Sequence, residues 1–256
     1  MITVFKIGGN VINDQDALMR FLTDFSNFPG KKILVHGGGK EATELSKKTG
    51  IETKMIEGRR VTDRETLDLV TMVYAGLINK RIVAMLQKMQ CDALGLTGSD
   101  AHVIPADQRN PEPIDYGYVG DIDPADINTG FIESVLDMGC VPVFCAICLN
   151  KKGGLLNCNA DSIASALAVA CSHADTTDLI YCFEKPGVLT QINDDSSVIP
   201  HITTSVFKEL KESGKVSGGM IPKVSNALMA VEKGVNSVRI CSASDFINKG
   251  GTLIHN

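Results

Sequence analysis

The chain has 256 residues, of which 44% are hydrophobic and 21% are charged, and its formal net charge is -5. This length allows one large domain or two lobes with a substantial core, and the lack of a basic arm or patch gives no support to a nucleic-acid partner. Residues 1–20 lack a signal-peptide pattern, and the longest apolar stretch, residues 140–149, is too short to span a bilayer. We therefore expect a cytoplasmic protein with no membrane association.

Short apolar runs alternate with amphipathic stretches along the whole chain. The apolar runs predict buried strands at residues 2–7, 32–36, 93–96, 141–147, 179–182 and 237–241. Helical patterns occupy residues 14–25, 40–49, 161–170 and 223–233. Because the strands are continuously apolar, this alternation predicts an α/β protein with a mainly parallel sheet. No linker interrupts it, so we expect two lobes of one domain.

Two segments break this alternation. Residues 61–90 form a helical stretch about twice the usual helix length, and its apolar face predicts a core contact or a subunit contact. That face carries Leu67, Val70, Val73 and Tyr74. Residues 103–121 are polar and rich in proline and glycine, which predicts a protruding hairpin or a lid.

Glycine-rich turns with nearby lysines lie at both ends of the chain. Lys6 precedes the glycines at positions 8 and 9, and Lys223 follows those at 218 and 219. A third turn, residues 37–39, is glycine throughout and lies between a strand and a helix. Backbone N–H groups at such junctions bind anions, and glycine lets a ligand approach the backbone closely. This pattern is typical of an enzyme that handles a polyphosphate and an anionic acceptor.

Polar side chains occur at other junctions. Asp161 opens a helix, where it suits an N-cap, and it also points into the usual ligand crevice of an α/β sheet. Asn157 and Asn159 share one strand face, so both amides can reach one ligand. Arg60 suits bidentate binding of a carboxylate, whereas we interpret Arg59 as solvated.

A histidine and a cysteine pair have structural explanations. His36 ends a strand, and we interpret it as a packed, hydrogen-bonded side chain rather than a base. Cys145 and Cys148 have CxxC spacing, but they lie in a predicted buried strand and no second CxxC completes a zinc set. We therefore expect no metal held by the protein itself.

Together these motifs resemble the amino acid kinase superfamily and, within it, the N-acetylglutamate kinases. The resemblance covers essentially the whole chain. The Arg-Val-Thr and Asn-x-Asn-Ala-Asp segments distinguish it from carbamate, uridylate and aspartate kinases. The motifs, in order, are Lys6-Ile7-Gly8-Gly9, His36-Gly37-Gly38-Gly39, Gly58-Arg59-Arg60-Val61-Thr62-Asp63, Asn157-Cys158-Asn159-Ala160-Asp161, Pro186-Gly187-Val188-Leu189 and Gly218-Gly219-Met220-Ile221-Pro222-Lys223.

The resemblance implies a fold, a reaction and a set of site residues. The fold is a three-layer αβα sandwich with a mainly parallel central sheet. Residues 1 to about 170 form a lobe that binds acyl-glutamate and dimerises, and residues from about 171 to 256 form an ATP-binding lobe. The reaction moves the γ-phosphoryl group of ATP, whose phosphates carry Mg²⁺, to the side-chain carboxylate of N-acetyl-L-glutamate, early in arginine biosynthesis.

The resemblance also implies a role for each motif. Lys6 and Lys223 neutralise charge on the phosphoryl group, and Asp161 holds the two lysines in place. The residues implied in acceptor binding are Gly38, Gly39, Arg60, Asn157 and Asn159. The residues implied in ATP binding are Gly8, Gly9, Glu184, Lys185, Gly187, Leu189, Ser217, Gly218 and Gly219.

Two departures from the family pattern keep alternatives open. Glu184 stands where an aspartate is common, which affects the details of ATP contacts. Residues 144–148 are rich in cysteine where serine, proline and glycine are common, so an N-succinyl acceptor is an alternative to N-acetyl. Free glutamate as acceptor and a non-catalytic sensor are further alternatives, whereas the glycine spacing disfavours a dinucleotide-dependent oxidoreductase.

The quaternary structure can be predicted in part. Arginine-inhibited relatives carry an extra N-terminal helix that builds a hexameric ring. The first strand here begins at about residue 2. We therefore expect a homodimer formed across the long helix after Arg60, without feedback by arginine.

Overall fold

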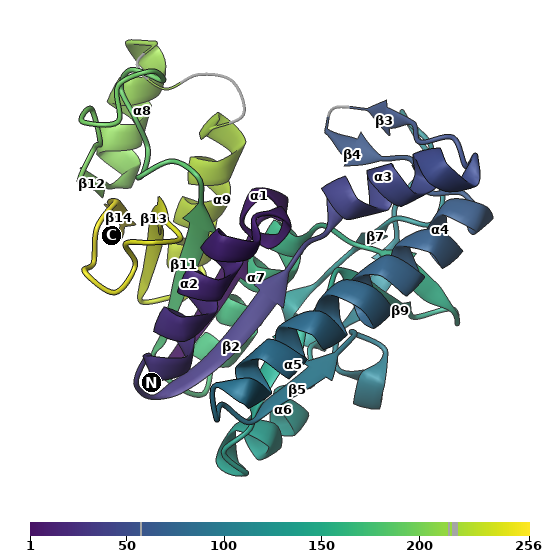
Figure 1. The fold of residues 1–256 in the computed structure, drawn as a ribbon. Coiled ribbons are helices and arrows are strands. Elements are labelled where there is room, and N and C mark those ends of the chain that lie inside the picture. Colours follow the sequence, from purple (N-terminus) through teal and green to yellow (C-terminus); the bar gives the residue numbers. More distant parts are fainter. Residues whose placement is uncertain (57, 215, 217–219) are drawn as a thin grey trace.

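Figure 1 shows a computed structural model, which describes residues 1–56, 58–214, 216 and 220–256. An eight-stranded sheet lies between two layers of helices, which confirms the predicted three-layer α/β sandwich. Every neighbouring pair in this sheet is parallel except β13 with β14. The order across the sheet is β12 (His201–Ile202), β14 (Thr252–Ile254), β13 (Ser237–Ser242), β11 (Thr177–Phe183), β1 (Ile2–Ile7), β2 (Lys31–His36), β8 (Val141–Phe144) and β5 (Ala93–Leu96).

Helices cover both faces of this sheet. One layer contains α2 (Gln15–Asn27) and α5 (Asn79–Lys88), and the other contains α6 (Thr129–Asp137), α7 (Ala160–Ser172) and α9 (Met220–Glu232). Aromatic rings fix the first layer, because Phe25 of α2 meets Phe5 of β1 edge to face at 5.1 Å between ring centroids. The other helical elements are α1 (Gly9–Asn13), α3 (Gly39–Thr49), α4 (Arg64–Thr71), α8 (Thr204–Glu212), the π-helix η1 (Met72–Ile78) and the 3₁₀ turns η2 (Asp100–His102) and η3 (Pro124–Asp126).

The predicted long helix is a continuous rod made of α4, η1 and α5. It begins at Arg64 rather than at residue 61, because the side chain of Asp63 caps it by accepting a hydrogen bond from the backbone N–H of Thr66 (2.8 Å). Its predicted apolar face is buried in the core. Among the described residues, Arg64–Lys88 is the one helix long and apolar enough to cross a membrane, and 44% of its most apolar window is buried within this fold.

A smaller, four-stranded sheet packs beside the central one. Its strands, in order, are β10 (Leu155–Asn157), β9 (Ile147–Asn150), β6 (Pro105–Gln108) and β7 (Gly120–Asp121). The prediction of one strand at residues 141–147 is wrong, because β8 ends at Phe144 and β9 starts at Ile147 in this second sheet. Both strands are buried, so the apolar run carries no sign of the break. The remaining hairpin pairs β3 (Met55–Ile56) with β4 (Arg59–Arg60).

The segment at residues 103–121 contains the predicted hairpin, formed by β6 and β7. It folds back onto the protein, since Tyr116 is buried and its backbone carbonyl accepts a hydrogen bond from the N–H of Thr62 (2.9 Å). The hairpin therefore packs against the body of the protein.

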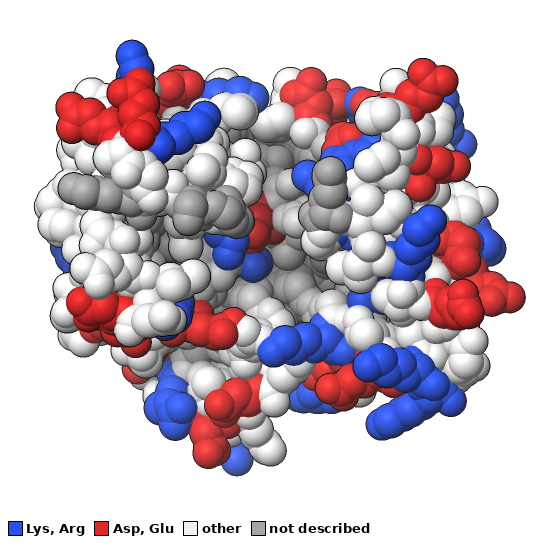
Figure 2. All heavy atoms as spheres, turned by 90° about the horizontal axis from the view of Figure 1, so that it is seen from above, with Lys and Arg blue, Asp and Glu red and all other residues white. Residues whose placement is uncertain are grey.

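The carboxyl ends of the parallel strands β1, β2 and β11 meet at one edge of the central sheet. Figure 2 views the molecule from that edge and shows a hollow between its two halves, with basic and acidic atoms at its base. The predicted boundary between lobes, at about residue 170, falls inside α7 and stays a prediction.

Candidate active site

The two predicted catalytic lysines line one cavity at the carboxyl ends of β1 and β11. The cavity has a volume of about 320 Å³ and is also lined by Asp161 and Glu184. Lys6 lies near the end of β1, and Lys223 lies in the first turn of α9. The Nζ atom of Lys6 is 2.7 Å from Oδ1 of Asp161, and the Lys6 side chain is only 9% exposed. Elements from both ends of the chain thus bring two cations and a carboxylate together.

Asp161 is the second residue of α7 and does not cap it, so the prediction of Asp161 as the N-cap is wrong. The cap is Asn159, whose side-chain oxygen accepts hydrogen bonds from the backbone N–H groups of Asp161 (2.8 Å) and Ser162 (3.2 Å). Because Asn159 satisfies these donors, the Asp161 carboxylate is left to pair with Lys6. Part of the Asn159 amide is therefore committed to the helix.

An aromatic ring lies beneath the two ammonium groups. The Nζ atom of Lys223 is 3.7 Å from the centroid of the Phe183 ring, and that of Lys6 is 5.0 Å from it. Burial lowers the pKa of Lys223, Asp161 opposes this shift, and the charge of Lys6 adds to it. Sequence reasoning missed Phe183 because an aromatic residue at the end of a buried strand looks like core.

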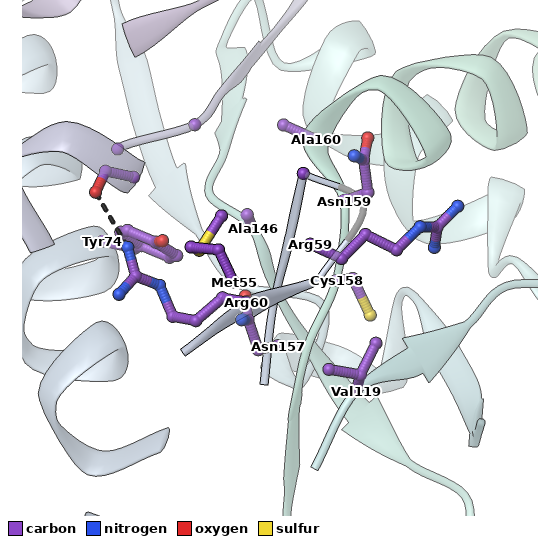
Figure 3. Close-up of a pocket in the computed structure, with 14 residues that line it drawn as sticks. Met55, Arg59, Arg60, Tyr74, Val119, Ala146, Asn157, Cys158, Asn159 and Ala160 are labelled. Atoms are coloured by element: carbon purple, nitrogen blue, oxygen red, sulfur yellow. Dashed lines mark hydrogen bonds between the residues drawn. The ribbon is translucent and has the colours of Figure 1, made fainter. Parts of the chain in front are cut away.

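A second cavity, of about 190 Å³, adjoins the first through Gly39, which lines both. All five residues predicted to bind the acceptor line it: Gly38, Gly39, Arg60, Asn157 and Asn159. Figure 3 shows the Arg60 and Asn157 side chains in this pocket. It also shows Arg59, which the sequence led us to interpret as solvated but which is half-buried and lines the same pocket.

Arg60 is held firmly in this second cavity. Its guanidinium group donates to the carbonyl of Gly39 (2.9 Å), to Oγ1 of Thr43 (2.8 Å) and to Oγ1 of Thr53 (3.0 Å). A guanidinium group has five N–H donors, so two are left after these three bonds to described residues. The Asn157 amide donates to Oγ1 of Thr62 (3.0 Å), and within the described part of the chain its oxygen and second N–H have no partner.

The glycine at position 38 is required by packing. A Cβ atom there would lie 2.4 Å from Cδ1 of Ile78 and 2.7 Å from Cδ1 of Tyr74. Both side chains come from the π-helix η1, a helix type often found at functional sites. Tyr74 also lines the second cavity, a role that its place in an apolar helical face did not reveal.

His36 is fully buried behind the glycine turn, as predicted. Its Nδ1 donates to the carbonyl of Gly37 (2.8 Å), and its Nε2 accepts from the side-chain amide of Asn79 (3.1 Å). Burial lowers the pKa of His36 to about 4, so the ring is neutral at pH 7. Both nitrogens are engaged, which agrees with a structural histidine.

The residues predicted to bind ATP are only partly brought together. Gly8, Gly9 and Glu184 line the first cavity. Lys185 instead pairs with Asp195 (3.0 Å), and Gly187 packs against Thr252. Among the described residues, neither they nor Leu189 line that cavity. Ser217, Gly218 and Gly219 lie outside the described residues.

Comparison with known proteins identifies the family. Residues 1–242 match the Amino acid kinase family. The acetylglutamate kinase of Phocaeicola vulgatus is 47% identical over 253 residues, which is 99% of this chain and 98% of that protein. The chain belongs to the amino acid kinase family, among its acetylglutamate kinases. It is therefore a kinase, and the predicted family is confirmed.

Solved structures share the fold of this chain. A Streptococcus mutans protein is 30% identical with a TM-score of 0.78, and the match covers 99% of this chain and 98% of that protein. Carbamate kinase from Giardia lamblia bound to AMP-PNP has a TM-score of 0.70 at 17% identity, covering 100% of this chain and 98% of that one, which shows the shared fold. The amino acid kinase fold predicted for this chain is thereby confirmed.

Proposed function

We propose that the two cavities joined at Gly39 transfer the γ-phosphoryl group of ATP to the side-chain carboxylate of N-acetyl-L-glutamate. A cavity containing Lys6, Lys223 and Asp161 lies beside a pocket containing Arg60, and Gly39 of the glycine turn lines both. The first cavity suits a phosphoryl group between cations, and the second suits an amino acid with a free carboxylate.

The chemistry needs little from the protein besides charge and position. A glutamate carboxylate has a pKa of about 4.3, so it is already a nucleophile at neutral pH and needs no general base. Its oxygen attacks the γ-phosphorus while the bond to the ADP oxygen breaks, giving an acyl phosphate and ADP. The obstacle is repulsion between two anions. Lys6 and Lys223 counter it, and the Asp161 carboxylate keeps Lys6 in place.

The second cavity orients the acceptor. The two remaining donors of Arg60 bind the α-carboxylate of the acceptor, and Asn157 contacts its amide. The backbone N–H groups of Gly38 and Gly39 bind the reacting carboxylate, since both glycines line this pocket. Asn159 lines the same pocket while it caps α7. The relatives are named acetylglutamate kinase, which favours an acetyl group over the N-succinyl alternative.

ATP occupies the first cavity, with its phosphates towards Gly8 and Gly9. Mg²⁺ commonly binds to phosphate oxygens with one or two protein carboxylates. The sequence led us to expect Mg²⁺ to be held through the ATP phosphates alone, but Glu184 fits this need, because it lines the cavity and has no ion pair among the described residues. Mg²⁺ held there would offset phosphate charge. Of the remaining ATP-binding assignments, those at Lys185, Gly187 and Leu189 stand on the family resemblance alone.

We propose a homodimer formed across the long helix, because apolar side chains are exposed on the outer face of that helix. Met72 is 63% exposed and Leu77 is 49% exposed on this rod, and Leu94 of the adjacent edge strand β5 is 39% exposed. Exposed apolar side chains next to an unpaired strand edge are typical of an interface. Light scattering should give twice the mass of the chain, and Leu77→Glu should shift it towards the monomer. A monomeric wild type would contradict this part of the proposal.

Phosphorylation of N-acetylglutamate is an early step of arginine biosynthesis, and we propose that the protein carries it out in the cytoplasm. A trapping assay tests the reaction. The protein is incubated with Mg-ATP and hydroxylamine, which converts an acyl phosphate to a coloured hydroxamate. N-acetylglutamate, N-succinylglutamate and glutamate are offered separately. We expect signal with N-acetylglutamate, whereas signal only with another acceptor would contradict the proposed substrate.

A further inference from the structure

Phe183 lies where the two catalytic lysines meet. It is the last residue of β11, and its ring is partly buried at the wall of the first cavity. Lys223 approaches the ring centroid to 3.7 Å and Lys6 to 5.0 Å, from α9 and β1 respectively. Cation–π attraction is significant within about 6 Å of the centroid, so both ammonium groups are in range.

The ring is itself held in place. Tyr181 lies two residues earlier on the same face of β11, and its ring stacks on that of Phe183 with centroids 6.0 Å apart and planes at 18°. The Tyr181 hydroxyl donates to the backbone carbonyl of Asp161 (3.2 Å). Each residue thus contacts the next in a ring of four: Phe183, Tyr181, Asp161 and Lys6. Lys223 joins this ring through its contact with Phe183.

The charges in this cavity explain why a ring is useful there. Lys6 and Lys223 repel each other, and the Asp161 carboxylate is paired with Lys6 at 2.7 Å. Glu184 also lines this cavity and attracts Lys223, but a carboxylate in direct contact with the Lys223 ammonium would compete with the ATP phosphates for it. The face of a benzene ring attracts a cation through its quadrupole but cannot neutralise it.

We propose that Phe183 is a positioning residue, whose π face holds the Lys223 and Lys6 ammonium groups against the phosphoryl-transfer cavity. This inference rests on the proposed function, because the lysines are taken as the groups that stabilise the transition state. It predicts that the electrons of the ring matter as well as its volume.

Fluorinated phenylalanines at position 183 separate these two contributions. Mono-, di- and trifluorination withdraw electrons from the ring and barely change its size. We expect kcat to fall stepwise, by about two- to thirtyfold at trifluorophenylalanine, while KM for both substrates changes less than about twofold. Phe183→Leu should lose at least as much. The same trifluorination at Phe131, a partly buried ring of α6, provides the matched control and should leave kcat unchanged.

A second readout does not depend on turnover. The pKa of Lys223 can be followed by NMR of ε-¹³C-lysine, with the signal assigned by its absence in Lys223→Arg. We expect a lower pKa in the trifluorinated protein than in the wild type, because a ring poor in electrons stabilises the ammonium less. Equal pKa values, or a kcat that is constant across the fluorinated series, would overturn the inference. Wild type that fails to phosphorylate N-acetylglutamate would instead refute the proposed function and leave the NMR comparison valid.

Discussion

Replacing Lys6 by methionine should remove a large part of catalysis while leaving substrate binding nearly intact. Methionine keeps the unbranched apolar stem of lysine but not its charge. The ammonium group of Lys6 is 2.7 Å from Asp161 and its side chain is 9% exposed, so its charge is poorly screened by water. The Lys6 ammonium therefore strongly stabilises negative charge that develops on the phosphoryl group in the transition state.

The magnitude follows from Coulomb's law. Two unit charges about 4 Å apart interact with about 4 kcal/mol at an effective dielectric constant of about 20. Part of this attraction already exists with bound ATP, and the part gained in the transition state is about 3 kcal/mol, as for other preorganised donors. That energy corresponds to a fall in kcat of about 10²- to 10³-fold. The KM values should change by less than about threefold.

Steady-state kinetics with the hydroxamate assay measure both constants. Lys31→Met is the matched control, because Lys31 also pairs with an aspartate, Asp137 at 2.6 Å, but is 43% exposed and lies at the opposite end of its strand from the glycine turn. The control should retain its full rate. A Lys6→Met enzyme with unchanged kcat, or with all of its loss in KM, would refute the reasoning. Thermal melts of both variants exclude a simple loss of fold.

Three further predictions concern the glycine turn, Arg60 and His36. Gly38→Ala should destabilise the fold by about 1–3 kcal/mol in urea unfolding and raise KM for N-acetylglutamate, because its Cβ would lie 2.4 Å from Ile78; unchanged stability would contradict the packing. Arg60→Lys should raise KM for N-acetylglutamate about ten- to a hundredfold and leave KM for ATP unchanged, since an ammonium cannot keep three fixed bonds and still bind a carboxylate; an equal rise in both KM values would argue against this role. The pKa of buried His36 is about 4 in the fold and about 6.5 in the unfolded chain. The contribution of His36 to the free energy of unfolding is therefore complete above pH 6.5 and falls by about 3 kcal/mol as the pH decreases to 4. Urea unfolding of His36→Gln should lack this part of the pH dependence, and the same slope in both proteins would disprove it.

Much of the fold was predictable because buried strands and surface helices leave different hydrophobic patterns in the sequence. Continuous apolar runs marked β1 and β5 to the residue. The break between β8 and β9 was not predictable, because both strands are buried and leave the sequence apolar throughout. Asn159 and Asp161 are both residue types that cap helices, and they stand two positions apart, so the sequence does not show which one is the cap. The hydrogen bonds identify Asn159.

The candidate site was predictable where chemistry limits the choice of residue. Lysines, glycine turns and an arginine in this pattern have few structural uses. The structure gathers Lys6, Lys223, Arg60 and the glycines at positions 8, 9, 38 and 39 around two adjoining cavities. Phe183 was not predictable, since an aromatic residue at the end of a strand is most often core. Its role depends on which cations approach the ring, and that is a property of the tertiary structure.

Transfer of oxygen from the acceptor to phosphate tests the central claim most directly. N-acetylglutamate labelled with ¹⁸O in its side-chain carboxylate is turned over with Mg-ATP and hydroxylamine, and the released phosphate is examined by ³¹P NMR. If the carboxylate oxygen attacks the γ-phosphorus, hydroxylamine then cleaves the acyl carbon–oxygen bond, and each phosphate carries one ¹⁸O. Unlabelled phosphate, formed at the same rate with and without the acceptor, would mean that ATP is hydrolysed and that the carboxylate is not the nucleophile.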